Sequence, residues 1–440
     1  MTRTLERYEQ AFAGARQARG TGPDRLVRRR EEAFARFQAL GFPTTRDEEW
    51  RFTSVAPIAD QAFALGAAPM PDPKYAALLP YRLPGLFGAE LVFVDGHYMP
   101  SLSTPGALPR GVRAGNLAAA LGEEVEAYLA RVAPFDRQAF VALNTALFTD
   151  GACIHVPAHT IVDAPIHVLF LSTGHANGAL TMSHPRVLVV LGDDSQASVV
   201  ESYAGPGDAR YFTNTVTELV LGQNAVLDHY KLQHESMRAY HVGTVQVRAG
   251  RSANCASHSI SLGGGLVRND VFAVLDGEGV ECTLNGLYVG DEQRLVDNHT
   301  TIDHAKAHCG SREIYKGILA ERARGVFNGK IIVRPDAQKT DAKQTNRALL
   351  LSEDAQINTK PQLEIFANDV KCTHGAAIGQ LDEEAVFYLR SRGFGRAEAR
   401  RLLIHAFAGD VLDRMPIAAI RTGVEQVLQR QLAHVLDAAA

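Results

Sequence analysis

The sequence has few cysteines, and none of them stands in an arrangement that usually holds a fold or a metal. Its 440 residues contain five cysteines, at positions 153, 255, 282, 309 and 372, and no two of these form a C-x-x-C pair. An odd set without such pairs argues against a disulfide framework and against a self-contained zinc site. A metal bound by this chain would need histidine, carboxylate or ligands from another chain.

Long apolar runs and a dominant charge are missing as well. No run approaches the roughly 20 apolar residues that span a bilayer, and residues 1–19 lack the apolar centre of a secretory signal. Lysine and arginine number 45 against 49 aspartate and glutamate, for a net charge of -4. This balance gives no reason to expect nucleic acid or an anionic membrane as a partner. We therefore expect a cytoplasmic protein.

Signatures of nucleotide and hydrolase chemistry are also lacking. The stretch GVFNGKI, residues 325–331, has one residue too few between its glycines for a P-loop, and Ile331 stands where Ser or Thr would bind magnesium. We interpret this stretch as a turn beside a strand. No G-x-S-x-G elbow occurs in the sequence. If the process that this protein serves uses ATP, we expect another chain to hydrolyse it.

What the sequence does contain is helical periodicity at both ends. Apolar residues recur at helical spacing over 24–40 and 118–132, on either side of the turn-rich segment 41–53, which holds the only tryptophan, Trp50. After Gly379, Asp382 begins a helix that Gly393 ends, and further helices are expected over 396–412 and 420–436. We predict a mainly helical N-terminal domain, residues 1–150, and a helical C-terminal domain, residues 381–440.

Between these regions, residues 151–380 are short stretches rich in Val, Ile, Thr and Leu. A similar turn recurs among them, opened by Gly192, Gly222, Gly250, Gly277 and Ser352; the glycines are 30, 28 and 27 residues apart, and Ser352 follows 75 later. This period predicts a β-helix, in which each coil buries its apolar face against its neighbours. We expect small residues at the corners to adopt left-handed backbone conformations. A two-sheet sandwich with coincidental spacing is the alternative.

Potential metal ligands gather in residues 297–317. They are Asp297, His299, Asp303, His304, His308 and Cys309. Imidazole, thiolate and carboxylate all bind transition metals. However, the spacings match no standard zinc motif, and buried histidines in stacked coils also form hydrogen-bond ladders. We favour a structural role for this group and keep metal binding as the alternative.

A thiol and an imidazole lie two residues apart in DVKCTHGA, residues 369–376. In a strand, Cys372 and His374 share one face and lie about 7 Å apart. Two ligands cannot fill the four-coordinate shell of zinc or of an iron in a cluster. The pair is therefore either inert packing or half of a site that a partner completes.

Three stretches carry a family resemblance. They are PTTRDEEWRFT at 43–53, SREIYKGIL at 311–319 and the long segment 325–393, which includes KCTHGA and GQLDEE. The chain resembles the SufB/SufD scaffold proteins of the Suf iron-sulfur cluster assembly system. Its modest length, the motif around Trp50 and the GQLDEE ending are more similar to SufD than to SufB, whose additional cysteines it lacks.

The resemblance implies a fold, partners and site residues. It implies a mainly β protein with a right-handed parallel β-helix core over 151–380, flanked by the two helical domains. It implies a scaffold without enzymatic turnover that assembles with SufB and the SufC ATPase, and that holds no cofactor stably by itself. His374, with Cys372 as a weaker neighbour, is expected at the SufB interface, where a transient iron-sulfur cluster forms and His374 serves as a metal ligand.

The resemblance also places the ATPase on the C-terminal helices. The apolar residues that we expect to dock it are Val386, Leu389, Leu402, Leu403 and Phe407. Whether the isolated chain forms a homodimer through the strand edge stays open. The rival interpretation is a β-helix enzyme acting on carbohydrate, with Asp336 and Asp341 as paired acids, although such enzymes are usually exported.

Overall fold

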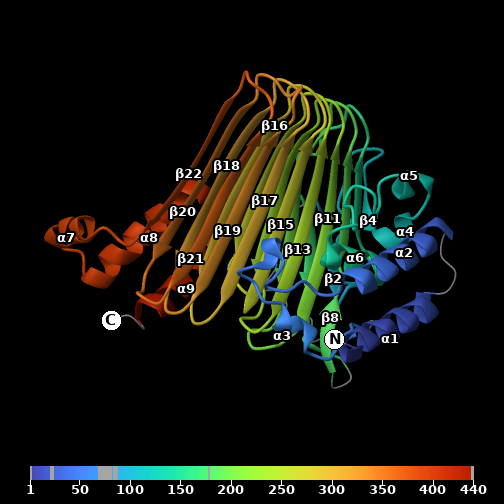
Figure 1. Ribbon diagram of the computed structural model, residues 1–440, viewed down its shortest axis with the longest axis horizontal. Helices are drawn as coiled ribbons and strands as arrows, with labels where there is room; N and C mark the ends of the chain where they lie inside the picture. The colour runs from blue at the N-terminus through green and yellow to red at the C-terminus, as the bar shows by residue number, and fades with distance from the viewer. Residues whose placement is uncertain (1, 20–23, 68–81, 83–87, 177–178, 438–440) are drawn as a thin grey trace.

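The chain forms a parallel β-helix with helices at both ends (Figure 1). The computed structural model describes residues 2–19, 24–67, 82, 88–176 and 179–437. From β9 onward, odd-numbered strands form one sheet and even-numbered strands form the other; we call them the odd sheet and the even sheet. Neighbouring strands are parallel and in register, as in the pairs β17–β19 and β18–β20. The β-helix predicted from the turn period is confirmed.

Each coil contributes one strand to each sheet. The odd sheet contains β9 Arg186–Leu191, β11 Phe212–Leu221, β13 Tyr240–Ala249, β15 Leu266–Leu275, β17 Leu295–His304, β19 Arg324–Val333 and β21 Gln356–Ile365. The even sheet contains β10 Gln196–Ala204, β12 Val226–His234, β14 Asn254–Ser261, β16 Glu281–Gly290, β18 Gly310–Leu319, β20 Asp341–Leu350 and β22 Lys371–Gly379.

Strands from earlier in the chain extend the stack at its N-terminal end. β5 Gly151–Val156 and β4 Arg113–Asn116 continue the odd sheet, and β6 Ile166–Leu171, β2 Ala89–Val94 and β3 His97–Tyr98 continue the even sheet. The short strands β1 Phe63–Leu65, β7 His175–Ala176 and β8 Ala179–Ser183 pair beside β11. Because β3 and β4 each pair antiparallel, the parallel stacking stops at this end.

The space between the two sheets is the core. Alternate residues of each strand point into it and form one continuous apolar cluster that includes Leu219, Leu227, Cys255, Cys282 and Ile302. Burial of this cluster is the main force that holds the coils together. Polar side chains also lie inside and are bonded to one another across the coils, as His229 is to Glu201 at 3.0 Å.

The corner between odd and even strands has the same backbone shape in successive coils. One residue per coil has a positive φ, between 54° and 70°: Asp194, Asn224, Ser252, Gly279, His308 and Lys339. The N–H of each of these residues donates to a carbonyl in the next coil, as Asn224 does to Arg251 and Ser252 does to Glu278. The left-handed residue is therefore two positions after the glycine that opens the turn.

The turn-opening glycines are needed for a different reason, which is close approach. A Cβ on Gly277 would lie 2.1 Å from the backbone nitrogen of Arg251, and one on Gly192 would lie 2.5 Å from that of Ala158. The corners of adjacent coils touch through their backbones at these points. Ser352 does not belong to this row, because it lies at the opposite corner, between β20 and β21. Its fit to the period was coincidental.

Helices from the first 150 residues cover the outer face of the odd sheet. α1 Thr2–Arg19, α2 Asp24–Leu40, α3 Ala56–Ala59 and α6 Ala139–Leu147 share an apolar cluster with residues of β11, β13 and β15, among them Phe212, Val242 and Leu266. The helix predicted over 24–40 is confirmed. Figure 1 shows these helices together at the N-terminal end of the stack.

The helix predicted over 118–132 does not form as one piece. The structure has two short helices instead, α4 Leu117–Ala120 and α5 Glu123–Glu126. Ala130 adopts a positive φ of 57°, and the N–H groups of Ala130 and Ala133 donate to the carboxylate of Glu218. Glu218 is fully buried and pairs with Arg186 at 2.6 Å. The carboxylate of Glu218, on a distant strand, thus accepts hydrogen bonds that backbone carbonyls would accept in a continuous helix.

The C-terminal helices cover the outer face of the even sheet. α7 is Glu383–Ser391, α8 is Arg396–Leu412 and α9 is Ala418–Asp437, close to the predicted bounds. The second half of α8 and most of α9 share an apolar cluster with Tyr230, Ile260 and Leu287 of the sheet. α7 projects away from the β-helix (Figure 1). Among the described residues, no helix is long and apolar enough to cross a membrane.

The backbone contact at the corner predicts a specific cost for a single methyl group. Gly277→Ala forces its Cβ into the backbone of Arg251, and we expect it to destabilise the β-helix by about 1–3 kcal/mol. Gly207→Ala is the matched control, since no atom lies within 4 Å of its Cβ position. Urea unfolding followed by circular dichroism measures both. Equal midpoints for the two variants would contradict the close approach.

Candidate functional site

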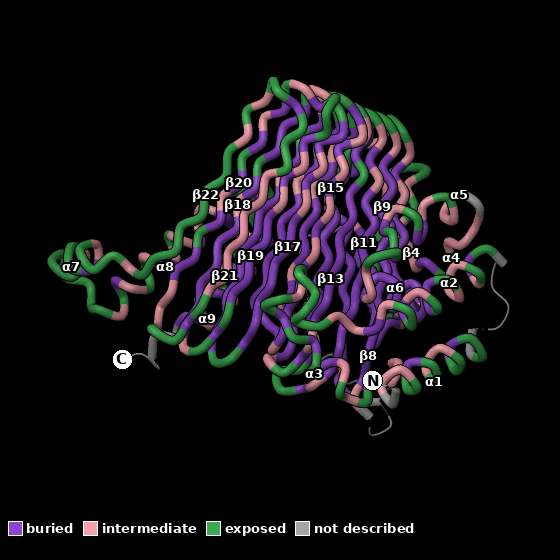
Figure 2. The backbone as a smooth tube through the Cα atoms, viewed as in Figure 1, coloured by how far each residue is buried: buried purple, intermediate pink, exposed green. Residues whose placement is uncertain are grey.

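In the part of the chain that the structure describes, the stack of coils ends at β21 and β22, with no further coil on top. We call β21, β22 and the residues that connect them the open end. Every residue of β22 except Cys372 is exposed, and Figure 2 shows this strand as the exposed margin of the β-helix. Ile365, Phe366 and Ile378 are exposed there, Phe366 by 64%. An unpaired strand edge with apolar side chains is a surface suited to another chain.

Cys372 and His374 both lie on β22 at the open end. Cys372 packs against an interior cluster that includes Ile331, Val333 and Ala342, so its side chain points into the coil. His374 is two residues further along the strand and therefore shares that face, but it is exposed because no coil covers it. The shared face predicted for the pair follows from this placement.

The side chains of Cys372 and His374 differ in how readily they could bind a metal ion. Burial raises the pKa of the Cys372 thiol above its ordinary value, which disfavours the thiolate that binds metals. His374 is open to solvent. Among the described residues, no group of three or more His, Cys, Asp or Glu side chains is arranged to hold a metal ion. A metal ion at His374 would therefore need donors from outside the described residues to complete its coordination shell.

The ligand-rich stretch 297–317 is divided among three places. His299 lies on the outer face of the odd sheet, between Asp297 and Glu49 at 3.1 and 3.2 Å. His304 lies inside, 2.9 Å from the hydroxyl of Ser311, and burial lowers its pKa to about 4. The left-handed corner residue His308 is exposed. The side chains named in this stretch do not converge on one point.

Asp336 and Asp341, the proposed paired acids, have different surroundings, and the stretch GVFNGKI belongs to a strand. Asp336 is exposed in a turn, whereas Asp341 forms an ion pair with Arg312 at 2.8 Å. The stretch GVFNGKI lies inside strand β19 and is not a turn. A Cβ at Gly329 would lie 2.2 Å from the side-chain nitrogen of Gln344 and would displace that carboxamide. The glycine makes room inside the coil.

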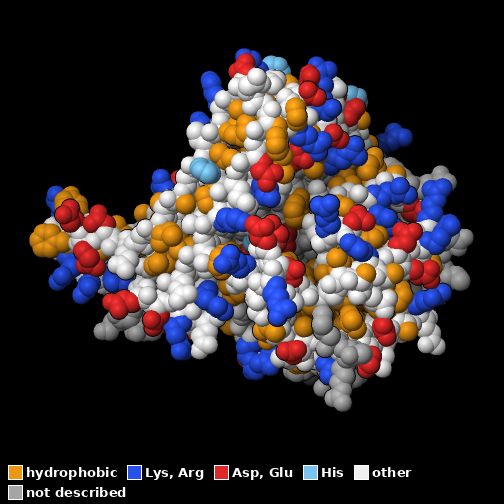
Figure 3. All heavy atoms as spheres, in the orientation of Figure 1, with side chains coloured by type: hydrophobic (Ala, Val, Ile, Leu, Met, Phe, Trp, Pro, Cys, Tyr) orange, Lys and Arg blue, Asp and Glu red, His pale blue; other side chains and the backbone are white. Residues whose placement is uncertain are grey.

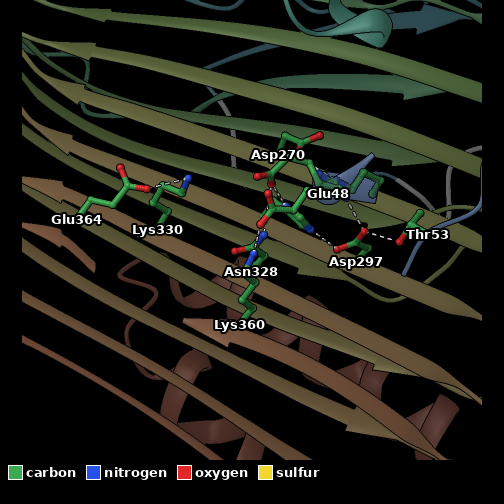
Figure 4. Close-up of polar contacts among 11 residues, drawn as sticks. Glu48, Thr53, Asp270, Asp297, Asn328, Lys330, Lys360 and Glu364 are labelled. Carbon is green, nitrogen blue, oxygen red and sulfur yellow. Dashed lines mark hydrogen bonds and ion pairs between the residues drawn. The ribbon is translucent and has the colours of Figure 1, made fainter. Parts of the chain in front are cut away.

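Residues 47–53 form a second polar centre that the sequence did not reveal; we call this segment the strap. It crosses the outer face of the odd sheet (Figure 4). Arg268 of β15 donates to the Glu49 carbonyl at 2.8 Å and lies 4.3 Å from the centre of the Trp50 ring. Thr53 donates to Asp297 of β17 at 2.5 Å.

Further contacts attach the strap to strands nearer the open end. The Glu49 carboxylate accepts from Asn328 of β19 at 3.3 Å, and Lys360 of β21 donates to Glu48 at 2.5 Å. The strap thereby connects strands from β15 to β21. Burial and Arg268 both oppose the imidazolium form of His299, but the Asp297 and Glu49 carboxylates outweigh them and raise its pKa above the ordinary value.

The C-terminal helices present an apolar surface that includes Leu402 of the five predicted docking residues. Val386 is buried, and Leu389, Leu403 and Phe407 are half-buried. Among the described side chains of these helices, the large apolar ones that are exposed are Phe387, Tyr388, Phe394 and Leu402; we call this set the helical tip. Phe387 is 71% exposed, and hydrophobic atoms gather over α7 in Figure 3. The four consecutive apolar residues 386–389 cannot all lie on the one helix face that packs against the rest of the protein. This run is the sequence signal from which the exposed tip could have been predicted.

One lysine fastens α8 to the sheet. Lys316 of β18 is buried on the outer face of the even sheet. Its ammonium group donates to the Phe407 carbonyl at 2.9 Å, forms an ion pair with Asp410 at 2.9 Å and lies 4.4 Å from the centre of the Phe407 ring. Phe407 therefore belongs to the attachment of the helix and not to its free surface.

Comparison with known proteins covers nearly the whole chain. The family described as SUF system FeS cluster assembly, SufBD core domain, matches residues 170–407, and the SufBD protein N-terminal region matches residues 3–168. An iron-sulfur cluster assembly SufBD family protein of Synechocystis is 35% identical over 433 residues, which are 96% of this chain and 94% of that protein.

Two further relatives have similar coverage. The iron-sulfur cluster assembly protein SufD of Escherichia coli is 32% identical over 392 residues, 89% of this chain and 88% of that protein. Protein ABCI7, chloroplastic, of Arabidopsis thaliana is 31% identical over 404 residues, 90% of this chain and 84% of that protein. Each of the three alignments extends over 89% or more of this chain.

The raised pKa of His299 predicts that the attachment of the strap depends on pH. The charged imidazole, which faces Asp297, Glu49 and Arg268, stabilises the fold fully below about 6.5, the value in the unfolded chain. This contribution is lost as the pH rises through the higher folded value. We expect the urea midpoint of Trp50 fluorescence to fall with rising pH in the wild type and to change less in His299→Gln.

Trp50 is the only tryptophan, so its fluorescence reports on the strap. His308→Gln is the control, because His308 is exposed at a corner, away from the strap. It should retain the pH dependence of the wild type. An equally steep pH dependence in His299→Gln would show that another group controls the attachment.

Proposed function

The chain belongs to the SufBD family of iron-sulfur cluster assembly proteins, and on this premise we propose that it is a SufD-like scaffold subunit without turnover of its own. The iron-sulfur cluster is the cargo of this process and not a resident cofactor. The observation that supports the proposal is the open end, where an unpaired strand edge, exposed apolar side chains and an imidazole occur together.

A SufB-like subunit is the partner that we propose for the open end. β22 offers its free peptide groups to a strand of another chain, and the side chains of Phe366 and Ile378 offer apolar area for burial. His374 would then lie in the interface as one ligand to iron, with thiolates of the partner as the others. Cys372 contributes less because its thiol is half-buried. Without that partner, the same edge suits a second copy of this chain.

An ABC-type ATPase similar to SufC is the partner that we propose for the helical tip. The tip is apolar at its centre and has charged neighbours such as Glu383, Arg390 and Arg396, an arrangement typical of protein interfaces. ATP-driven motion of α7 and the first turns of α8 would act on the β-helix through the attachment of α8 at Lys316. In this proposal, that motion opens the interface to iron and sulfide.

Removal of the imidazole tests the proposed cargo site. The chain is co-expressed with SufB-like and SufC-like partners, and iron and acid-labile sulfide are measured per purified complex. We expect His374→Ala to lower both several-fold while the complex stays intact by size-exclusion chromatography, because the side chain is exposed and supports no core. Thr373→Ala, on the opposite face of the same strand, is the control. Normal loading of His374→Ala would remove His374 from the site.

Substitution in the helical tip tests the ATPase interface. Phe387→Asp places a charge where we propose apolar contact, and we expect at least about a tenfold loss of ATPase affinity, the size of a typical hot spot. Ile161→Asp is the control, since Ile161 is also an exposed apolar residue but lies near the first coils. Calorimetric titration with the ATPase measures both. Equal affinity in the two variants would place the interface elsewhere.

A further inference from the structure

Three side chains from successive coils stand in one column below the open end. In the even sheet, Glu313 of β18 is in register with Gln344 of β20, and Gln344 is in register with His374 of β22. Neighbouring strands lie about 4.8 Å apart. Because Cys372 contacts the interior cluster, His374 on the same face of β22 lies directly over Gln344. The column therefore leads from the interior to the exposed imidazole.

Gln344 is held in a single orientation by its surroundings. It is only 2% exposed, and its Nε2 donates to Oε2 of Glu313 at 2.8 Å. Gly329 faces the carboxamide from the odd sheet and provides its space, since any Cβ there would overlap Nε2. Burial raises the pKa of Glu313 to about 7, but the neutral carboxyl keeps Oε2 as an acceptor when its proton is on Oε1.

The other end of this carboxamide lacks a partner. Oε1 of Gln344 is buried and accepts no hydrogen bond from the described residues. A buried acceptor without a donor costs free energy, about 1–3 kcal/mol, so a donor that reaches this oxygen would stabilise the chain. The nitrogen faces Glu313 in the coil below, which leaves the oxygen for a donor from the coil above. His374 is the residue of that coil in register with it.

Metal-binding histidines commonly donate their second ring N–H to a carbonyl or carboxylate, which fixes the ring and its tautomer. We propose that Gln344 is the positioning residue of His374: its Oε1 accepts one ring N–H of the imidazole and leaves the lone pair of the other nitrogen directed out of the open end. Glu313 keeps the carboxamide in the required orientation. This inference rests on the proposed function of His374, but the contact itself is testable without partners.

The first measurement uses the full chain alone, labelled with nitrogen-15 in the histidine rings. The His374 signals are identified by their loss in His374→Ala. At fixed pH, we expect one neutral tautomer of His374 in the wild type and a mixture of both in Gln344→Leu. Gln344→Glu retains an acceptor and should restore the single tautomer. An unchanged tautomer in Gln344→Leu would overturn the proposal, whatever the chain does with partners.

The second measurement is the iron and sulfide content of the complex with partners. We expect Gln344→Leu to lower loading several-fold and Gln344→Glu to recover most of it. Asn346→Leu is the control: Asn346 is a buried residue on the same face of β20, but it is in register with Ala376, which has no ring. It should change neither the His374 tautomer nor the loading.

The outcomes separate the contact from the function. A changed tautomer with normal loading in Gln344→Leu, when His374→Ala lowers loading, would overturn the positioning role. Normal loading in His374→Ala would overturn the proposed function of His374 and with it the role of Gln344 in loading. If Gln344→Leu does not fold, Gly329→Ala replaces it, because its Cβ displaces the carboxamide without removing it and should give the same mixed tautomer.

Discussion

The structure depends on one constraint, which is that parallel strands in register satisfy their peptide groups only through the next coil. Each coil is stable because it has a neighbour on both sides, and the stack must therefore solve the problem of its two ends. At the N-terminal end, the antiparallel strands β3 and β4 stop the stacking. At the other end, β22 has no strand beyond it among the described residues, so the fold itself creates a surface that another chain can complete.

Register also decides what the open end contains. A shift by one residue would exchange the two faces of a strand and would turn Cys372 and His374 outward. The apolar cluster around Ala342 opposes such a shift, since it would expose these side chains and bury charged neighbours. The column of Glu313, Gln344 and His374 thus exists because packing elsewhere in the coil fixes the register. Residues about 30 positions apart in the sequence become neighbours at one strand spacing.

The sequence predicts features that repeat or that are local. The turn period gave the β-helix, and helical spacing gave α2 and α8 with their observed bounds. Features that depend on contact between distant segments were missed or misplaced. Gly329 was assigned to a turn because the carboxamide of Gln344, which faces it, lies across the interior on strand β20 of the other sheet. The segment around Ala130 left the helical path for the buried carboxylate of Glu218, and the contacts of Glu49 with Arg268 and Asn328 join residues more than 200 positions apart.

Strand β18 belongs to both of the surfaces that matter for the proposed function. Its outward residue Lys316 holds α8 through Phe407 and Asp410, and its inward residue Glu313 supports Gln344 below the imidazole. Only two residues separate these two attachments along a strand that hydrogen bonds fix on both sides. In the proposed function, a force on α8 would reach β18 at Lys316, and Glu313 of the same strand would connect it to the column below His374. The motif SREIYKGIL, which carries both residues, joins the helices to the site.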